Sequence, residues 1–126
     1  MKNISYICNM KASELRIENY IKMFEEDGFI DIKLNLNDIC NVECAIDNRF
    51  KPIPLTEEWL IKFGFEKLNV DIIRYEKSNL IVEWLFERWT GRLYDDFETS
   101  IQITEIKYVH QLQNLYFALT QKELEL

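Results

Sequence analysis

The sequence predicts an α+β fold: an N-terminal β layer, a short helix, an antiparallel β meander and a C-terminal amphipathic helix. Three observations predict it. Start and stop signals frame a helix at residues 57–63, apolar residues alternate with a period of two in the segments that follow, and helical spacing returns at 108–119. With 126 residues, the chain suits a single compact domain, the alternative being a subdivision into residues 1–50 and 51–126.

The N-terminal layer, SH3-like or a simple hairpin, is predicted from one clear strand. Residues 30–36 alternate between apolar and polar side chains, and Glu26-Asp27-Gly28 just before them is a hairpin-turn signal. Residues 14–24 fit two interpretations, a helix behind a Ser13 cap or the first arm of that hairpin, and the pattern does not choose between them.

The helix at 57–63 is predicted from both of its ends. Thr56 is a good N-cap, and two glutamates follow it in the first turn, where the helix dipole favours negative charge. Leu55 and Leu60 have the spacing of a hydrophobic staple. Gly64 can adopt the left-handed conformation that ends a helix, with Phe65 folding back on Leu60.

The meander is predicted from period-two patterns after this helix. Residues 80–86 indicate a mostly buried strand, with 70–76 as its hairpin partner across residues 77–79. Gly91 is expected to open the next turn, and residues 100–106 give another strand.

The C-terminal helix is predicted from an apolar stripe over residues 108–119. Side-chain amides, among them Gln113, are expected on its polar side. Its last residues are expected to fray, because no glycine closes it.

Charge and composition narrow the classes of partner. Lys and Arg total 15 against 22 Asp and Glu, a net charge of −7, and no stretch forms a basic stripe. This charge disfavours direct binding of DNA, RNA or anionic lipid, whereas basic surfaces of other proteins are suitable partners. No apolar run approaches the ~18 residues of a membrane span, and the N-terminus lacks a signal-peptide pattern. Three cysteines then indicate reduced thiols and a cytoplasmic protein.

Three stretches carry a resemblance to a known family. KASELRIENY, KPIPLTEEWLIKFGFEK and IKYVHQLQNLYFAL, about a third of the chain, resemble a family of small uncharacterised proteins of phages and prophages of Bacteroidota. Family members usually have glycine where this chain has Glu18, and often where it has Gln121. The resemblance implies an SH3-like barrel or hairpin layer before residue 50 and a mobile-element origin, and it implies no catalytic residue.

Side chains that commonly carry chemistry form no recognisable active-site motif. Cys40 and Cys44 are a close pair, but four residues on a strand span ~13 Å, so structural thiols are a better interpretation than a metal site. His110 opens the C-terminal helix, where a packing or capping role is expected. The chain has neither a nucleophile elbow nor a glycine-rich phosphate loop. We therefore expect a protein without catalytic activity, metal or cofactor.

Aromatic residues suggest a binding role instead. Trp89, flanked by Arg88 and Arg92, has the composition of an interface hot spot if its parity exposes it, with Asp95 and Asp96 as a charged rim. Burial in the core is the competing interpretation of Trp89.

The preferred function is a binding protein of phage or prophage origin that acts by protein–protein contact and inhibits a host defence nuclease complex, as anti-CRISPR proteins do. Its partner would be a host or phage protein, such as a basic nucleoprotein complex. Two alternatives remain open: a nucleic-acid accessory module that uses Trp89 and its two arginines, and a small metal-dependent hydrolase that uses Asp95, Asp96 and Glu98.

Overall fold

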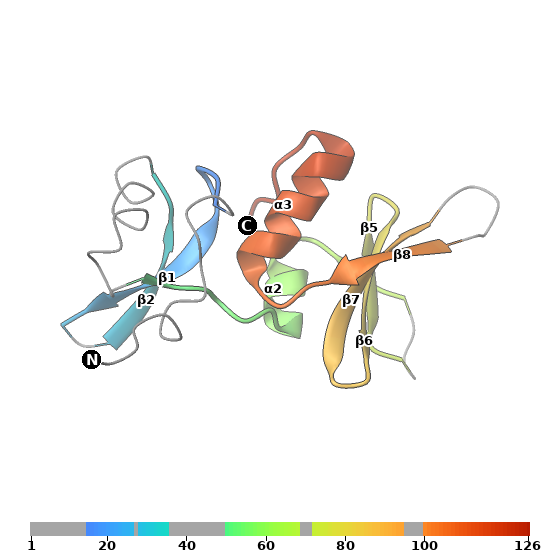
Figure 1. The fold of residues 1–126 in the computed structure, drawn as a ribbon, viewed down its shortest axis with the longest axis horizontal. Helices are drawn as coiled ribbons and strands as arrows, with labels where there is room; N and C mark the ends of the chain where they lie inside the picture. Colours follow the sequence, from blue (N-terminus) through green and yellow to red (C-terminus); the bar gives the residue numbers. More distant parts are fainter. Residues whose placement is uncertain (1–14, 27, 36–49, 69–71, 95–99) are drawn as a thin grey trace. The chain divides into compact units, whose positions relative to one another are not determined.

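A computed structural model describes residues 15–26, 28–35, 50–68, 72–94 and 100–126 of the chain (Figure 1). The chain forms two compact units, and neither is one continuous segment. Unit 1 comprises Met1–Pro54 and Tyr108–Leu115, and unit 2 comprises Leu55–Lys107 and Tyr116–Leu126.

Among the described residues the elements follow one another as strands, a short helix, further strands and a final helix. In order they are β1 (Tyr20–Glu25), β2 (Gly28–Lys33), β3 (Phe50–Lys51), α2 (Glu57–Lys62), β4 (Glu66–Lys67), β5 (Arg74–Lys77), β6 (Leu80–Leu85), β7 (Arg88–Tyr94), β8 (Ser100–Glu105) and α3 (Val109–Thr120). These elements confirm the predicted α+β class, with an antiparallel meander and a C-terminal helix.

Unit 1 contains a three-stranded antiparallel sheet in the order β2-β1-β3. In the segment with two interpretations, residues 14–24, the part from Tyr20 onwards is a strand: β1 and β2 form a hairpin in which Glu25 is opposite Gly28. One face of this sheet carries Ile21, which is packed in a core with Leu15, Leu34 and Phe50. The hairpin form of the N-terminal layer is therefore the one that the described residues adopt.

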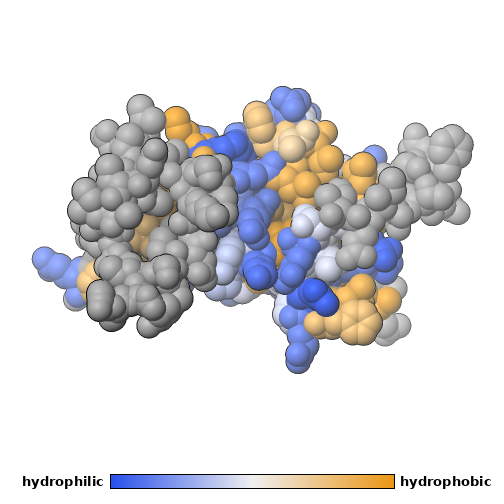
Figure 2. Space-filling view, viewed as in Figure 1, coloured by the Kyte–Doolittle hydropathy of each residue, from blue (hydrophilic) through white to orange (hydrophobic). Residues whose placement is uncertain are grey.

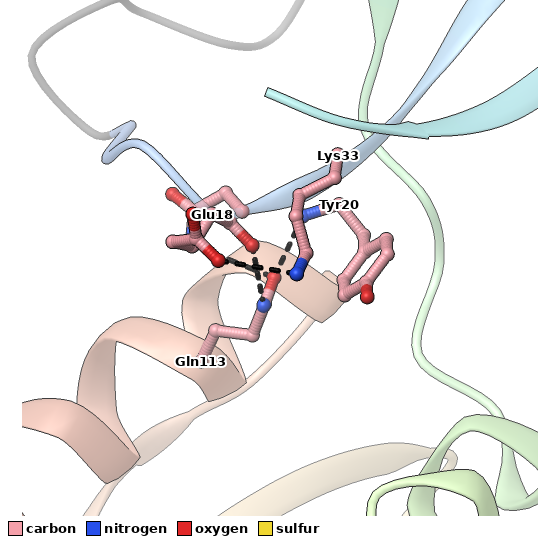
Figure 3. Close-up of polar contacts among 5 residues, drawn as sticks. Glu18, Tyr20, Lys33 and Gln113 are labelled. Carbon is pink, nitrogen blue, oxygen red and sulfur yellow. Dashed lines mark hydrogen bonds and ion pairs between the residues drawn. The ribbon is translucent and has the colours of Figure 1, made fainter. Parts of the chain in front are cut away.

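Within unit 1, Gln113 links the first half of α3 to the first residue of β1 and to the backbone just before it. Its side-chain nitrogen Nε2 donates to the Glu18 carbonyl at 3.0 Å, and its oxygen Oε1 accepts from the Tyr20 backbone N–H at 2.8 Å (Figure 3). Gln113 is fully buried although it belongs to the polar side of the helix. Its burial is favourable because the amide forms hydrogen bonds with the Tyr20 N–H and the Glu18 carbonyl, which would otherwise be left without a partner.

Beside this contact lies a network that ties the turn before β1 to the same helix. Asn19 is buried and donates from Nδ2 to Asn114 Oδ1 at 3.0 Å, and Arg16 Nε donates to the same oxygen at 2.8 Å. On the surface next to it, the Glu18 carboxylate lies 3.1 Å from Lys33 Nζ (Figure 3). That carboxylate, and after it Tyr20, raises the pKa of Lys33.

Helix α2 of unit 2 begins and ends where the sequence predicts. Thr56 Oγ1 accepts from the Trp59 backbone N–H at 3.4 Å. At the other end Gly64 has φ +88°, its N–H donates to Ile61, and the Phe65 N–H donates to the Leu60 carbonyl. This pair of bonds is a Schellman motif, which satisfies carbonyls that the end of a helix leaves open.

The side chain of Tyr75 on β5 connects the sheet of unit 2 to the first turn of α2. Its hydroxyl donates to Glu57 Oε1 at 2.5 Å, and the ring is buried. Burial, and after it the hydrogen bond to Glu57, raises the pKa of Tyr75 to about 12.

The five-stranded sheet of unit 2 has the order β4-β5-β6-β7-β8, each strand antiparallel to the next. As predicted, β5 and β6 form a hairpin, and its two-residue turn, Ser78-Asn79, has positive φ at both positions. The prediction that Gly91 opens a turn was wrong. Gly91 lies inside β7, next to an irregularity in the register between β7 and β8. A glycine inside a strand commonly marks such a bulge.

The C-terminal end of α3 is closed, so the expectation of fraying was wrong. Gln121 has φ +62°, the conformation that glycine usually supplies at this position, and its N–H donates to the Phe117 carbonyl at 2.7 Å. Thr120 Oγ1 donates to the Tyr116 carbonyl and accepts from the Lys122 N–H, and Leu124 beyond it is buried.

Candidate functional site

The β6–β7 hairpin of unit 2 carries three of the residues that the sequence nominates for binding. Trp89 is only 7% exposed, and its indole N–H donates to the Leu55 carbonyl at 3.0 Å. The competing interpretation of Trp89, burial in the core, is therefore correct, and the expected exposure was wrong. The parity argument failed at the turn: the loop between β6 and β7 has two residues, so Trp89 is directly opposite Trp84 and shares its face.

Arg92 lies on the opposite face of the sheet, where it takes part in an ion triad around Glu83. Glu83 Oε1 lies 2.9 Å from Arg92 Nε, and Oε2 accepts from Arg74 Nε at 2.9 Å. Glu83 is fully buried, and Arg74 is its direct partner on β5. The two guanidinium groups compensate the desolvation of the carboxylate, which would be costly for a lone buried charge. The triad, with Glu83 at its centre, thus joins β5, β6 and β7 across their shared face.

Arg88 stands at the start of β7, opposite Leu85, on the same face as the triad. It is exposed, and its Nη1 lies 3.8 Å from Glu105 Oε1 on β8. An exposed pair at this distance contributes little to stability, so the guanidinium of Arg88 remains accessible to a partner.

The turn between β6 and β7 presents an unusual pair of residues, Phe86 and Glu87. Their φ angles are +53° and +63°, a two-residue turn in which Asn-Gly is the usual sequence. Left-handed backbone costs a residue with a Cβ roughly 1–2 kcal/mol. The Phe86 side chain is 87% exposed, and that of Trp84 is 38% exposed.

These aromatics lie at the tip of a well-supported hairpin. Trp84 and Trp89 make an edge-to-face contact with centroids 5.2 Å apart, and Trp89 is anchored through its indole nitrogen to Leu55. Figure 2 shows hydrophobic surface at the turned end of β6 and β7. We define the hairpin tip as Trp84, Phe86, Glu87 and Arg88. It combines two exposed aromatic rings with an accessible guanidinium group, which lies on the other face of the hairpin from Trp84.

Five other residues that the sequence analysis considers fall in segments that the structure does not describe. Asp95, Asp96 and Glu98 lie outside the described residues, as do Cys40 and Cys44.

His110 is fully buried in unit 1, where its ring stacks on Tyr108 with centroids 5.8 Å apart. Across the described ranges, no three His, Cys, Asp or Glu side chains gather closely enough to hold a metal ion. Within the same ranges, no helix has the length and apolar character needed to cross a membrane.

Phe86 was the functional candidate that sequence reasoning missed, and the signal was present. The alternating pattern of residues 80–86 predicts that the strand includes Phe86. In the structure β6 ends at Leu85, which is opposite Arg88, so Phe86 lies in the turn. Comparison with known proteins gives no independent guide: no family model, curated protein or solved structure matches this chain.

Proposed function

We propose that this is a non-catalytic binding protein of phage or prophage origin that acts in the host cytoplasm by protein–protein contact and inhibits a host defence nuclease complex. The observation that carries the proposal is the hairpin tip, where Phe86 is almost fully exposed in a left-handed turn.

The composition of the tip suits an interface hot spot. Aromatic side chains and arginine are enriched among the residues that dominate binding energy, and here they stand together at one end of a hairpin. The tip also keeps an unfavourable backbone conformation that a different pair of residues would relieve. Strain of this kind is concentrated at sites that bind ligands or partners, so the sequence of the turn favours function over stability.

Two backbone positions support the proposed origin. Glu18 and Gln121, where the resembling phage family commonly has glycine, have φ angles of +88° and +62°. Glycine adopts these angles without steric cost. The glycines of that family would therefore suit the local backbone of this chain.

The charge of the chain supports the class of target. A net charge of −7 favours encounter with basic surfaces, and nucleases and other nucleic-acid-handling complexes carry such surfaces. Complementary charge would raise the association rate, while the aromatic tip would hold the complex.

The first experiment compares Phe86→Ala with the wild-type protein in capture of a partner from a Bacteroidota host lysate and in inhibition of that partner's nuclease activity. We expect Phe86→Ala to keep its melting temperature within about 2 °C and to lose at least about thirtyfold in affinity, because hot-spot truncations cost ~2 kcal/mol or more. Ile61→Ala is the matched control, because Ile61 is also a large exposed apolar residue of unit 2. Equal binding by Phe86→Ala and wild type would refute the assignment of the tip.

A second experiment separates strain from binding. Exchanging Phe86-Glu87 for Asn-Gly should stabilise the protein by about 1–2 kcal/mol, because both positions then suit a left-handed turn, and it should abolish partner binding. Asn79→Gly in the neighbouring turn is the control, since it relieves a similar φ of +66° and should leave binding unchanged.

A further inference from the structure

The outer face of the unit 1 sheet combines lysines with aromatic rings. The register places on one face the residues of β1, β2 and β3 that alternate with the core positions, namely Tyr20, Lys22, Phe24, Phe29, Asp31, Lys33 and Lys51. We call this set the lysine–aromatic face. The opposite face carries Ile21 and Phe50, which are buried in the unit 1 core, so the two faces differ sharply in role.

Two rings on this face are unusually open to solvent. Phe24 and Phe29 are directly opposite each other on β1 and β2, with centroids 5.3 Å apart and an edge-to-face geometry. Their side chains are 45% and 40% exposed, respectively. Two adjacent phenylalanines left this open on a sheet surface indicate a binding surface more than a packing contact.

The lysines lie over and between the rings. Lys51 Nζ is 4.8 Å from the centre of the Phe29 ring, and Lys33 Nζ is 5.7 Å from that of Tyr20. Lys22 is the direct neighbour of Lys51 across β1 and β3. The cations are therefore held beside the π surfaces and not scattered around the unit.

The local charge of the face is opposite in sign to that of the whole chain. Three lysines stand against two carboxylates, Asp31 on the face and Glu18 beside Lys33, which leaves a local excess of one positive charge in a chain whose net charge is −7. Screening confines the influence of distant surface charges to about 8 Å at physiological ionic strength, so the local excess of lysine decides what this face attracts.

We propose that the lysine–aromatic face binds single-stranded nucleic acid, with its bases stacking on the rings and its phosphates contacting the lysines. Sequence-tolerant binding of single strands uses this combination of cationic groups and aromatic platforms. An acidic protein segment would satisfy the lysines but would leave the exposed phenylalanines without a stacking partner. This proposal concerns a different unit from the hairpin tip and does not rest on the function proposed for it.

The size of the face sets the expected stoichiometry. From the Tyr20–Lys33 pair to the Phe24–Phe29 pair the strands advance four residues, about 14 Å at the usual rise. A strip of this length takes about two to four nucleotides, so we expect weak binding that depends on salt.

The test is fluorescence anisotropy of the full chain with labelled oligo(dT) and oligo(U) of about ten nucleotides, with duplex DNA and poly-glutamate as competitors. The logarithm of affinity should fall with the logarithm of salt with a slope of about −1.4, as two phosphate contacts to a single strand predict, because Lys33 is already paired with Glu18. We expect unlabelled single strands to displace the labelled oligonucleotide. Poly-glutamate or duplex DNA, added at the same total charge, should not displace it. Equal displacement by poly-glutamate would overturn the proposal in favour of an acidic protein partner.

Two classes of variant should respond differently. Phe24→Ala should weaken binding at least about fivefold without changing the salt slope, because it removes a stacking platform. Lys22→Gln with Lys51→Gln should flatten the slope by about 1.4, because it removes two phosphate contacts. Lys62→Gln and Ile61→Ala, which lie in unit 2, are the matched controls and should bind as wild type does.

Melting curves of each variant should match that of wild type, because none of the replaced side chains belongs to the unit 1 core. If Phe24→Ala binds with wild-type affinity, or if the controls lose as much as the lysine variant, the face is not the binding site.

Discussion

Replacing Gln113 tests whether its buried amide holds unit 1 together. In Gln113→Leu, a side chain of similar size takes the place of the amide. The Tyr20 N–H and the Glu18 carbonyl then lose the hydrogen bonds that Gln113 makes at 2.8 and 3.0 Å. Gln113 is fully buried, so water does not simply replace the amide.

The magnitude follows from the two groups that are left behind. Each buried polar group without its partner costs about 1–3 kcal/mol, and the added apolar burial of leucine offsets about 1 kcal/mol of the total. We expect a loss of about 3 kcal/mol in the free energy of unfolding. At a urea dependence of about 2 kcal/mol per molar, the midpoint falls by about 1.5 M.

Gln113→Glu adds a dependence on pH that distinguishes hydrogen bonding from packing. One carboxyl oxygen can still accept from Tyr20, but the other faces the Glu18 carbonyl and can donate only when protonated. Burial therefore raises the pKa of this glutamate in the folded state above its unfolded value of about 4.3. A raised folded-state pKa gives stability that is complete below the unfolded value and is lost as pH rises through the folded one.

The assay is urea denaturation followed by circular dichroism at about pH 5.5 and about pH 8. Tryptophan fluorescence is recorded in parallel, because all three tryptophans lie in unit 2 and so report on that unit alone. Gln113→Leu should be destabilised equally at both pH values, and Gln113→Glu more at the higher one. A Gln113→Leu midpoint within about 0.3 M of wild type would refute the role given to the amide.

Three further predictions concern other contacts. Glu83→Gln should lower the free energy of unfolding by about 3 kcal/mol, because it leaves two guanidinium groups without their shared counter-charge, and thermal melts measure the loss. Wild-type stability should fall as pH rises from about 10 towards 12, where Tyr75 ionises in the folded state. Tyr75→Phe should remove that part of the pH dependence and the matching tyrosinate absorbance step, and an unchanged step would contradict it. Gln121→Gly should stabilise the end of α3 by about 0.5–1 kcal/mol in the same melts, since glycine adopts φ +62° without a steric cost; a loss of stability would argue against it.

Local signals were enough to predict α2 and the β5–β6 hairpin. The cap at Thr56 and the stop at Gly64 depend on neighbours within a few residues, and the structure reproduces both. The turn before β2 likewise needs only Glu26 and the residues beside it.

What the sequence could not supply were contacts between distant segments. The pattern of the helix itself places Gln113 only on its polar side. The hydrogen-bond partners of Gln113 lie more than 90 residues earlier in the chain. The lysine–aromatic face depends on the pairing of Lys51 with β1, which no local pattern predicts. The predicted exposure of Trp89 was wrong for a related reason. A shift of one residue in the position of a turn reverses the face of the sheet to which each side chain of the next strand points.

The division of α3 between the units has a consequence for how this chain can be cut or recombined. Residues 108–115 complete unit 1, which otherwise ends at Pro54, and residues 116–126 complete unit 2. A gene fragment that stops at residue 54 encodes unit 1 without Gln113 and Asn114, and so without the hydrogen bonds that secure the start of β1. Neither unit can be transplanted as a single cassette, so recombination that preserves both must exchange the interleaved chain as a whole.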